Sequence, residues 1–412
     1  VYTFNKDKLQ EDEIYKTNTV VLYPTESQKE FLDKCIDLYR FTYNWTIEQK
    51  EIHYKRYKDG LEDSALIQDK TLIKRFSEFR KSNDWLKIIP MHTLRNAIYD
   101  AIDAYERFFT KRIKTKPKYK SKKTSKKSFA PEIQHTVFYF KKSGVHIAGL
   151  HYGETIQTKI NTDLCRMSNK RFRSARIVHN SMDRYILTYV TIEKKPIITT
   201  DMIDNKYNRA IGIDLNVKNL IVTSYNDGEI FKAIDMTHKE KQIKHYQRLC
   251  KKDFDRTKRI NQERANLDQE LLDKSNNAKK RSIILAKKYK KISNTNDTYI
   301  KTIAKKVVSR LPKAIVMEDL KIRKIQKENK YVAKYISKVP LYKIRKVFEY
   351  NCEKYNVPFI LADKDFPSTQ LCSRCGHKKD LKGYKYYVCN NCGLRLNRDI
   401  NASLNLEKLA YC

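Results

Sequence analysis

The first quarter of the chain combines one extended segment with a long helical pattern. Residues 17–23 read TNTVVLY, a short apolar run that predicts a strand. Thr25 and Gln28 have the spacing of a helix capping box, and apolar residues then recur every three or four positions in three segments. We therefore expect one strand followed by an all-helical module over residues 26–114.

The pattern changes after residue 128 to short apolar runs separated by glycines and polar turns. Runs of this length and composition are typical of β-strands. We expect them, together with the early strand, to form a small β-barrel or wedge from residues 1–25 and 115–200. The helical module is then an insertion between the first strand and the others.

A strictly alternating stretch, AIGIDLNV, begins at residue 210 and predicts a strand. Bulky residues occupy one face, and the other face carries Ala210, Gly212, Asp214 and Asn216. Asp214 is thus placed on a face with little bulk, where a metal ion and a phosphodiester have room. Taken alone, an acid at this position is equally consistent with the cap of a turn. Two more strands, at 220–224 and 229–233, complete a meander.

Residues 236–310 have a helical period and a high charge, with Lys and Arg outnumbering the acids. Asn276-Asn277 and the polar run 293–296 predict two breaks, and therefore a helical hairpin followed by a further helix. Charged faces of this kind are usually solvated, but a basic hairpin also suits a nucleic-acid duplex.

Two further acids are delivered to the same sheet. The continuous apolar run 314–317 predicts a strand buried on both faces, which ends in Glu318 at the edge where open α/β sheets keep their ligand sites. A helix (341–355) and a strand (359–362) follow. In the last helix, Asp399 shares one face with small and apolar residues, so packing on the sheet would carry Asp399 toward the other acids.

The balance of charge points to a polyanionic partner. Lys and Arg number 86 against 48 acids, a net charge of +38, which favours nucleic acid over an anionic membrane surface. The run 111–127 contains no acid and is more consistent with tracking a nucleic-acid backbone than with a solvated linker. Its candidate contact residues are Lys116, Lys118, Tyr119, Lys120, Lys122 and Lys123.

Nothing in the sequence indicates export or a membrane. The chain has no run of eighteen apolar residues, and the charged segment Val1 to Lys16 leads us to expect no secretory signal. Five of the nine cysteines show no pairing pattern, which indicates a reducing, intracellular setting.

The other four cysteines form two CxxC pairs, at Cys372/Cys375 and Cys389/Cys392. Two such pairs at this separation are typical of a structural Zn²⁺ site with four thiolate ligands. A redox dithiol or a disulfide pair is the alternative. We place the zinc ribbon over residues 368–397.

Asp214, Glu318 and Asp399 come from a first strand, a buried later strand and a closing helix. Three carboxylates gathered in this way can hold two Mg²⁺ ions roughly 3.5–4 Å apart, since Mg²⁺ prefers carboxylate oxygens. The sequence contains no Walker phosphate loop, GxGxxG motif or Ser-His-Asp arrangement, which weakens other enzyme classes.

These motifs resemble a known group of proteins. GIDLN (212–216), VMEDL (316–320), FPSTQLCSRCG (366–376) and YVCNNCGLRLNRDINAS (387–403) are similar to the transposon-encoded nuclease TnpB, to the compact type V CRISPR effectors and to the eukaryotic Fanzors. LRNAIYDAIDAYERFF (94–109), followed by PKYKSKK, is similar to the N-terminal half of that family.

The resemblance implies an α/β RuvC (RNase H-like) nuclease domain over 205–412 with an inserted zinc ribbon, preceded by a β-barrel wedge with an α-helical recognition insert. It implies RNA-guided cleavage of double-stranded target DNA beside a short flanking motif, with a guide RNA, two Mg²⁺ and one Zn²⁺. Asp214, Glu318 and Asp399 fall on the catalytic acids of the family, and Asp319 is a neighbouring, supporting acid.

The resemblance does not separate a transposon protein from a CRISPR effector or a Fanzor, and we expect a monomer or a homodimer. A prokaryotic chain would work in the cytoplasm or nucleoid, and a eukaryotic one in the nucleus. Two alternatives from other classes are a guided or zinc-ribbon repressor that binds DNA without cutting it, and an unguided DNA-binding protein or transposase.

Overall fold

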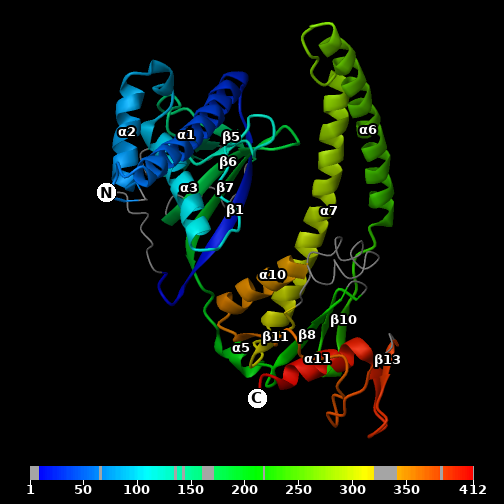
Figure 1. Ribbon diagram of the computed structural model, residues 1–412. Coiled ribbons are helices and arrows are strands. Elements are labelled where there is room, and N and C mark those ends of the chain that lie inside the picture. The colour runs from blue at the N-terminus through cyan, green and yellow to red at the C-terminus, as the bar shows by residue number, and fades with distance from the viewer. Residues whose placement is uncertain are drawn as a thin grey trace. The chain divides into compact units, whose positions relative to one another are not determined.

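The computed structural model describes residues 9–64, 67–133, 137–141, 144–159, 171–216, 219–319, 341–380 and 384–411 (Figure 1). The described chain divides into two compact units, and the boundary in the sequence lies between residues 193 and 194. Each unit has a sheet and a core of its own, and we describe the two separately. Within the described residues, no helix combines the length and the apolar character needed to cross a membrane.

Three helices follow the first strand of unit 1. They are α1 (Glu26–Lys58), α2 (Asp69–Lys81) and α3 (Met91–Phe109), with a short 3₁₀ turn at Asp84–Leu86. The predicted capping box is confirmed: the Gln28 amide donates to Thr25 Oγ1 at 3.3 Å, and the Thr25 amide donates to Gln28 Oε1 at 3.1 Å.

The sheet of unit 1 has seven strands in the order β2-β6-β7-β1-β5-β4-β3. The predicted early strand, β1, is confirmed as a member of this sheet, lying between β7 and β5. Within the region after residue 128 that we predicted to form strands, residues 134–136, 142–143 and 160–170 lie outside the described residues. The strands are β1 (Glu13–Tyr23), β2 (Ser128–Phe129), β3 (Tyr139–Lys141), β4 (Gly144–His146), β5 (Ile156–Thr158), β6 (Arg171–His179) and β7 (Tyr185–Lys194).

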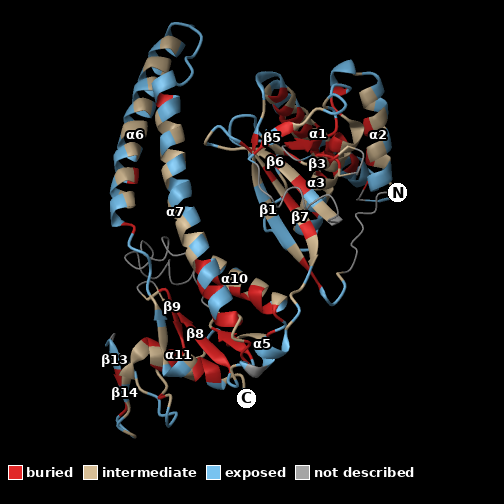
Figure 2. Cartoon of the chain, turned by 180° about the vertical axis from the view of Figure 1, so that it is seen from behind, coloured by how far each residue is buried: buried red, intermediate tan, exposed pale blue. Residues whose placement is uncertain are grey.

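One hydrophobic core joins the helices and the sheet of unit 1. Leu32 and Tyr39 of α1 and Ile98 of α3 pack in the same buried cluster as Ile177 and Leu187 of the sheet. In Figure 2 the buried positions of these helices and strands are coloured red. The apolar stripes of the predicted helical module are therefore used against the sheet as well as between helices.

Unit 2 is built on a five-stranded sheet with the order β10-β9-β8-β11-β12. The central strand β8 pairs in parallel with β11, and β11 in parallel with β12, whereas β9 and β10 are antiparallel. Parallel strands place their carboxyl ends at the same edge. The strands are β8 (Ile211–Leu215), β9 (Ile221–Thr223), β10 (Glu229–Phe231), β11 (Ile315–Met317) and β12 (Phe359–Leu361).

Helices cover both faces of this sheet. The end of α7 (Asn276–Val308) and α10 (Leu341–Lys354) pack on one face, against Ile213 and Met317. On the other face, α11 (Arg398–Lys408) packs Leu406 against Val316. All five residues of β8 are buried as a consequence. A short helix, α5 (Thr200–Asp204), precedes the sheet, and β13 (Tyr386–Val388) and β14 (Arg395–Asn397) form a separate hairpin.

The prediction that one face of β8 leaves room for a metal ion and a phosphodiester is therefore wrong for most of the strand, because α11 covers that face. Gly212 clears that face for α11 to approach, not for a ligand. Asp214 lies two residues further along β8, on the same face of the strand as Gly212, where α11 comes closest. Two positions of the predicted alternating stretch and its turn, 217 and 218, lie outside the described residues.

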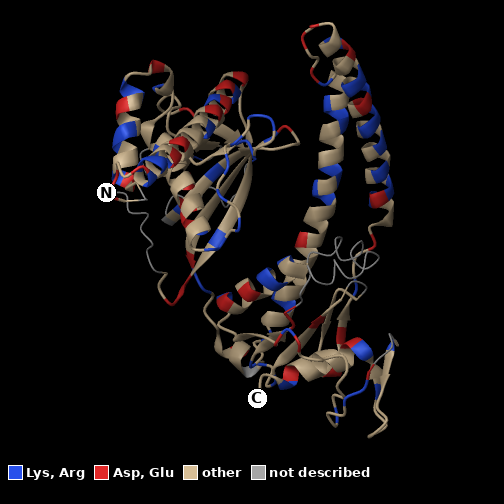
Figure 3. Ribbon diagram, in the orientation of Figure 1, with Lys and Arg blue, Asp and Glu red and all other residues tan. Residues whose placement is uncertain are grey.

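The helical hairpin is confirmed, but its predicted further helix is wrong. α6 (Thr237–Asn266) pairs with α7, which continues without a break through residues 293–296. The polar side chains there are tolerated because that part of the helix is largely exposed and Thr295 Oγ1 donates to the Lys291 carbonyl at 2.9 Å. Lys and Arg positions recur along both helices, as Figure 3 shows, and Asp and Glu positions gather at the hairpin tip.

Candidate active site

Asp214 lies on the central strand of the unit 2 sheet and is 4% exposed. Its burial depends on Gly212, two residues earlier on the same face of β8. A Cβ atom at position 212 would overlap the Ser403 carbonyl oxygen and the Glu407 backbone nitrogen of α11. Only glycine permits backbones to approach so closely, so Gly212 determines how near α11 lies to β8.

Glu318 directly follows β11, the parallel neighbour of β8. The register pairs Met317 with Ile213, which brings Glu318 beside Asp214. The Leu215 amide donates to Glu318 Oε1 at 3.0 Å and fixes the direction of this side chain. The sheet thus brings two of the predicted acids together at its carboxyl edge.

Asp399 approaches from the first turn of α11. The Asn397 side chain caps this helix by accepting from the Asp399 amide at 2.9 Å. Asn216 Nδ2 and Asn219 Nδ2 each donate to Asp399 Oδ2 at 2.8 Å. Because Asn216 directly follows β8, these bonds tie the helix acid to the strand that carries Asp214.

The three carboxylates interact electrostatically. Burial raises the pKa of Asp214 well above its usual value, and the charges of Glu318 and Asp399 raise that pKa further. Burial, reinforced by the charge of Asp399, raises the pKa of Glu318 to about 7, although the hydrogen bond from Leu215 opposes this. Carboxylates in this arrangement repel one another unless a proton or a cation lies among them.

The acids are neighbours but do not already form a closed set of metal ligands. In the described part of the chain, the group of His, Cys, Asp and Glu whose ligand atoms have converged on one point is the four-cysteine group. Asp319, the neighbouring acid, is bonded instead to Arg345 Nη1 at 2.8 Å on α10, which neutralises its charge.

Cys372, Cys375, Cys389 and Cys392 place their Sγ atoms within 4.8 Å of one another. The Cys372–Cys392 and Cys375–Cys389 Sγ distances are 3.5 and 3.6 Å. A tetrahedron with Zn–S bonds of about 2.3 Å has edges of roughly 3.8 Å, so these residues fit Zn²⁺. Hydrogen bonding, led by the backbone of His377, lowers the pKa of the exposed Cys375 thiol to about 6, which favours the thiolate.

Two buried asparagines connect the cysteine group to the helix that carries Asp399. Asn401 Nδ2 donates to the Leu371 carbonyl at 2.6 Å, and its Oδ1 accepts from the Ser373 amide at 2.9 Å. Asn405 Nδ2 donates to the Ser368 and Leu371 carbonyls at 2.8 and 2.7 Å. α11 is therefore bonded to the chain on both sides of Cys372, and we name these two residues the asparagine clamp.

The six candidate contact residues of the basic run belong to unit 1, whereas the three acids belong to unit 2. Lys116 pairs with Glu51 at 2.9 Å and Lys122 with Asp37 at 3.0 Å, and Tyr119 donates to Glu51 at 3.1 Å. The run therefore folds back on α1. Lys118 and Lys123 are exposed, and Lys120 is half-buried.

Sequence reasoning missed the amide side chains that organise this site. Asn216 was placed on the correct face of its strand without a role, and Asn219 and the asparagine clamp were not singled out. Asn401 and Asn405 are four residues apart in a helix, where Asn is a poor helix former. Two asparagines on one face of a helix could therefore have predicted buried side chains that form hydrogen bonds.

Three family models match the chain. Residues 193–329 match the family described as "Probable transposase", and residues 342–406 match "Cas12f1-like, TNB domain". Residues 14–59 match "Helix-turn-helix domain". In this structure the described residues of that last match form one strand and one uninterrupted helix, β1 and α1.

Curated relatives cover most of the chain at low identity. A protein of Streptomyces pristinaespiralis named "Putative RNA-guided DNA endonuclease" is 23% identical over 400 residues, 93% of this chain and 86% of the relative. A "TnpB-like protein" of Acanthamoeba polyphaga mimivirus is 22% identical over 400 residues, 94% of this chain and 72% of the relative.

The fold is also similar to a solved one. The structure described as "Cryo-EM structure of the Cas12f1-sgRNA-target DNA complex" superposes with a TM-score of 0.60 at 11% sequence identity, and covers 96% of this chain and 99% of its own. This likeness defines the class of the chain by its fold alone: the chain shares its fold with that Cas12f1 chain.

Within that class, the family matches and the named relatives agree on one group. The chain is similar to TnpB-like proteins and to Cas12f1-like proteins.

Proposed function

We propose that the chain is an RNA-guided DNA endonuclease that hydrolyses target DNA paired to a bound guide RNA. The observation that carries the proposal is the meeting of Asp214, Glu318 and Asp399 from three separate elements at one edge of the sheet. The printed names of the relatives and of the similar Cas12f1 complex support the guided activity on DNA.

In this proposal the three acids are the catalytic residues and hold two Mg²⁺ ions. Two bound ions would supply an activated water and would stabilise the leaving 3′ oxygen. The donor set fits, because Mg²⁺ prefers carboxylate oxygens and because three neighbouring carboxylates, of which Asp214 and Asp399 are buried, are stabilised by positive charge among them. Asn216 and Asn219 hold the Asp399 carboxylate, and the Leu215 amide holds that of Glu318.

The four cysteines hold one structural Zn²⁺ in this proposal. Zinc with four thiolate ligands has no open position, so its contribution is to fold the ribbon. The asparagine clamp gives the ribbon a second effect, since it bonds the Cys372 segment to α11. The ribbon would thereby help to position Asp399.

We assign the remaining parts by the same resemblance. The unit 1 sheet would be the wedge domain, closed as a barrel, and α1 to α3 the helical recognition insert. The ribbon over 368–397 would be the insert of a nuclease domain that spans 205–412. Basic surfaces on both units would hold the RNA and the paired strands through phosphates, while base pairing selects the sequence.

The test uses the full chain purified with the RNA that accompanies it. That RNA is sequenced, and a plasmid carrying the matching target beside randomised flanking bases is incubated with and without Mg²⁺. We expect cleavage that depends on Mg²⁺ and on the match. Asp214→Asn should reduce cleavage by about a thousandfold or more while the RNA stays bound.

The matched control is Asp268→Asn, the same change at an exposed position of the hairpin tip, which should cut normally. RNA-dependent binding of the target without cleavage by the wild-type chain would contradict the nuclease proposal and favour a guided repressor. Cleavage that proceeds without RNA would favour an unguided enzyme.

A further inference from the structure

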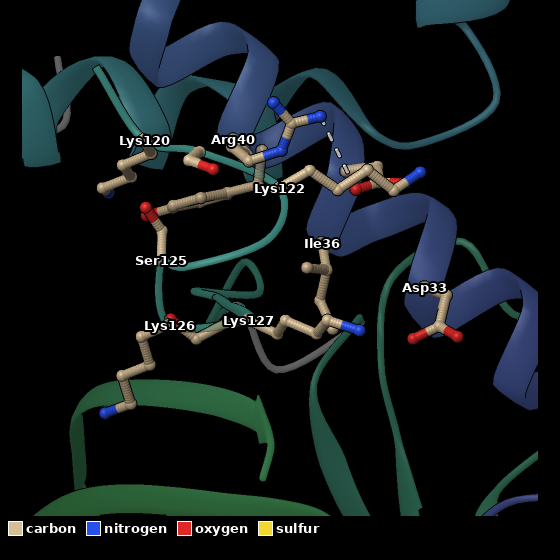
Figure 4. A pocket seen from close by; sticks show the side chains of 12 residues that line it. Asp33, Ile36, Arg40, Lys120, Lys122, Ser125, Lys126 and Lys127 are labelled. Carbon is tan, nitrogen blue, oxygen red and sulfur yellow. Dashed lines mark ion pairs between the residues drawn. The ribbon is translucent and has the colours of Figure 1, made fainter. Parts of the chain in front are cut away.

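A pocket of about 260 Å³ lies in unit 1 between one face of α1 and the loop formed by residues 120–128 (Figure 4). We name it the α1 pocket. Its volume is below the roughly 300–1,000 Å³ of sites for drug-sized ligands, so it suits a single small group. Cations and hydroxyls dominate the lining, which includes Arg40, Lys120, Ser121, Lys122, Ser125, Lys126, Lys127 and Ser128.

The loop that forms one wall is held at both ends. At its start, the Lys120 amide donates to Asn44 Oδ1 at 2.7 Å, and Asn44 Nδ2 donates back to the Lys120 carbonyl at 3.0 Å. At its end, the His179 amide donates to the Lys127 carbonyl at 3.0 Å, and Ser128 pairs with Val178 in the sheet. The cationic wall is thus positioned before any ligand binds, which lowers the entropic cost of binding.

Asp37 is one of the lining residues, and its carboxylate already forms ion pairs with two of the cations. Its carboxylate pairs with Lys122 at 3.0 Å and more loosely with Arg40 at 3.7 Å. The other aspartate of the lining, Asp33, is engaged elsewhere, because Tyr185 donates to it at 2.8 Å. The lining therefore combines five cationic side chains with two carboxylates, and the ion pairs among these described lining residues are those of Asp37.

Two of the cations have unsatisfied capacity. Arg40 Nε is buried and has no hydrogen-bond partner among the described residues. Lys120 Nζ lies 3.4 Å from the centre of the Tyr43 ring, and burial lowers the pKa of Lys120 to about 8. A bound anion would favour the charged form of Lys120, and the Arg40 side chain lines the same pocket.

We propose that the α1 pocket binds one phosphate group of the guide RNA, with Arg40, Lys126 and Lys127 as ligands and Asp37 as a competing carboxylate. The inference rests on the proposed function, since it takes RNA as the bound polyanion. The three proposed ligands are not among the six contact residues predicted from the sequence. Two of those six, Lys116 and Tyr119, are already bonded to Glu51 and are not part of the proposed site. A phosphate accepts several hydrogen bonds at once and matches the planar guanidinium of arginine.

The test measures the affinity of the full chain for the RNA that copurifies with it, transcribed separately, across a series of salt concentrations. Arg40→Ala should weaken binding about tenfold or more and should lower the salt dependence by about one phosphate contact. Arg40→Lys should restore only part of the loss, because a lysine lacks the fork of donors.

Asp37→Asn should raise the affinity for RNA, the opposite of the Arg40→Ala effect, because it removes the carboxylate that competes with the phosphate. Two matched controls separate this from general charge. Lys55→Ala and Glu30→Gln change exposed positions of the same helix outside the pocket lining. Each should alter affinity by less than the corresponding pocket variant.

The phosphate could be a chain terminus or an internal phosphodiester, and the RNA itself distinguishes them. If it is terminal, removing the 5′ or the 3′ phosphate should weaken wild-type binding and leave Arg40→Ala unchanged. If it is internal, neither removal matters and the Arg40→Ala loss persists. Both results support a phosphate in the pocket.

Pocket variants that behave like their controls would overturn the inference, and so would a loss confined to the binding of target DNA by a preformed RNA complex. In either case wild-type RNA binding and Mg²⁺-dependent cleavage would leave the proposed function standing. A wild-type chain that binds no RNA would overturn both.

Discussion

The two candidate metal sites of unit 2 are built in different ways. The four cysteine sulfurs already lie within 4.8 Å of one another and are brought together by two tight turns of local sequence. The three acids come from elements up to 185 residues apart, at positions 214 and 399, and are held by amides around a region of mutual repulsion. The candidate ligand atoms have already converged in the first arrangement and have not converged in the second.

The comparison also shows that the two sites are connected. The asparagine clamp bonds the Cys372 segment to α11, and α11 carries Asp399. The local site therefore stabilises one part of the non-local one. The following changes test the independence of the two sites and that connection.

The largest effect should follow loss of the ribbon. Cys389→Ser should abolish the bound zinc, measured by metal analysis of the purified chain. It should also reduce cleavage by roughly a hundredfold, because a small displacement of a reacting group has that order of effect. Cys250→Ser, the same change on α6, should keep zinc and activity. Full activity in the zinc-free variant would show that the clamp does not couple the sites.

A smaller effect should come from the amides that hold Asp399. Asn216→Ala removes a donor to Asp399, and its side chain also lowers the pKa of Asp214. Loss of such a supporting bond usually costs tenfold to a hundredfold in metal affinity or activity, so the Mg²⁺ concentration for half-maximal cleavage should rise. Asn277→Ala, at an exposed position of α7, is the control. An unchanged Mg²⁺ dependence would remove Asn216 from the site.

Gly212→Ala should lower the free energy of unfolding. A methyl group there meets the backbone of α11, and inserting a carbon into a packed core commonly costs about 1–3 kcal/mol. Gly60→Ala has no nearby atoms and carries only the strain of its left-handed backbone. Urea unfolding should therefore show a larger loss for Gly212→Ala, and equal losses would contradict the close packing of α11.

The smallest effect concerns pH. The pKa of Glu318 is raised to about 7 in the folded chain. Its contribution to stability is therefore full below the unfolded pKa, near 4.5, and is lost as the pH rises through about 7.

Without divalent ions, wild type should lose on the order of 2 kcal/mol between pH 5 and 8 relative to Glu318→Gln. Thermal unfolding measures this, with Glu353→Gln as an exposed control. Mg²⁺ at pH 8 should reverse the loss in wild type alone. Parallel pH profiles of wild type and Glu318→Gln would contradict the raised pKa.

The same contrast explains what could be predicted from the sequence. The cysteine pairs, the capping box at Thr25 and the buried strand before Glu318 are local patterns, and each lies where it was expected. The approach of the three acids was also predictable, since strand direction and helix periodicity place them at one edge. The domain boundaries and the roles of the site residues remain predictions.

Other features depend on packing that no local pattern reveals. The alternation of β8 suggested an open face, but α11 covers it and the strand is buried throughout. The polar run at 293–296 suggested a break, but an exposed helix tolerates it. The asparagine clamp and the fold-back of the basic run onto α1 are contacts between residues far apart in sequence, and their partners could not be paired from the sequence alone.

The central claim is that Asp214, Glu318 and Asp399 form one divalent-ion site. The most direct measurement is anomalous diffraction from crystals of the chain soaked with Mn²⁺, a substitute for Mg²⁺ that scatters anomalously. The account predicts manganese peaks among these three carboxylates in wild type and weakened or absent peaks in Asp214→Asn. Manganese bound elsewhere, or carboxylates that keep only their present partners, the neighbouring amides and Arg398, at saturating Mn²⁺, would contradict it.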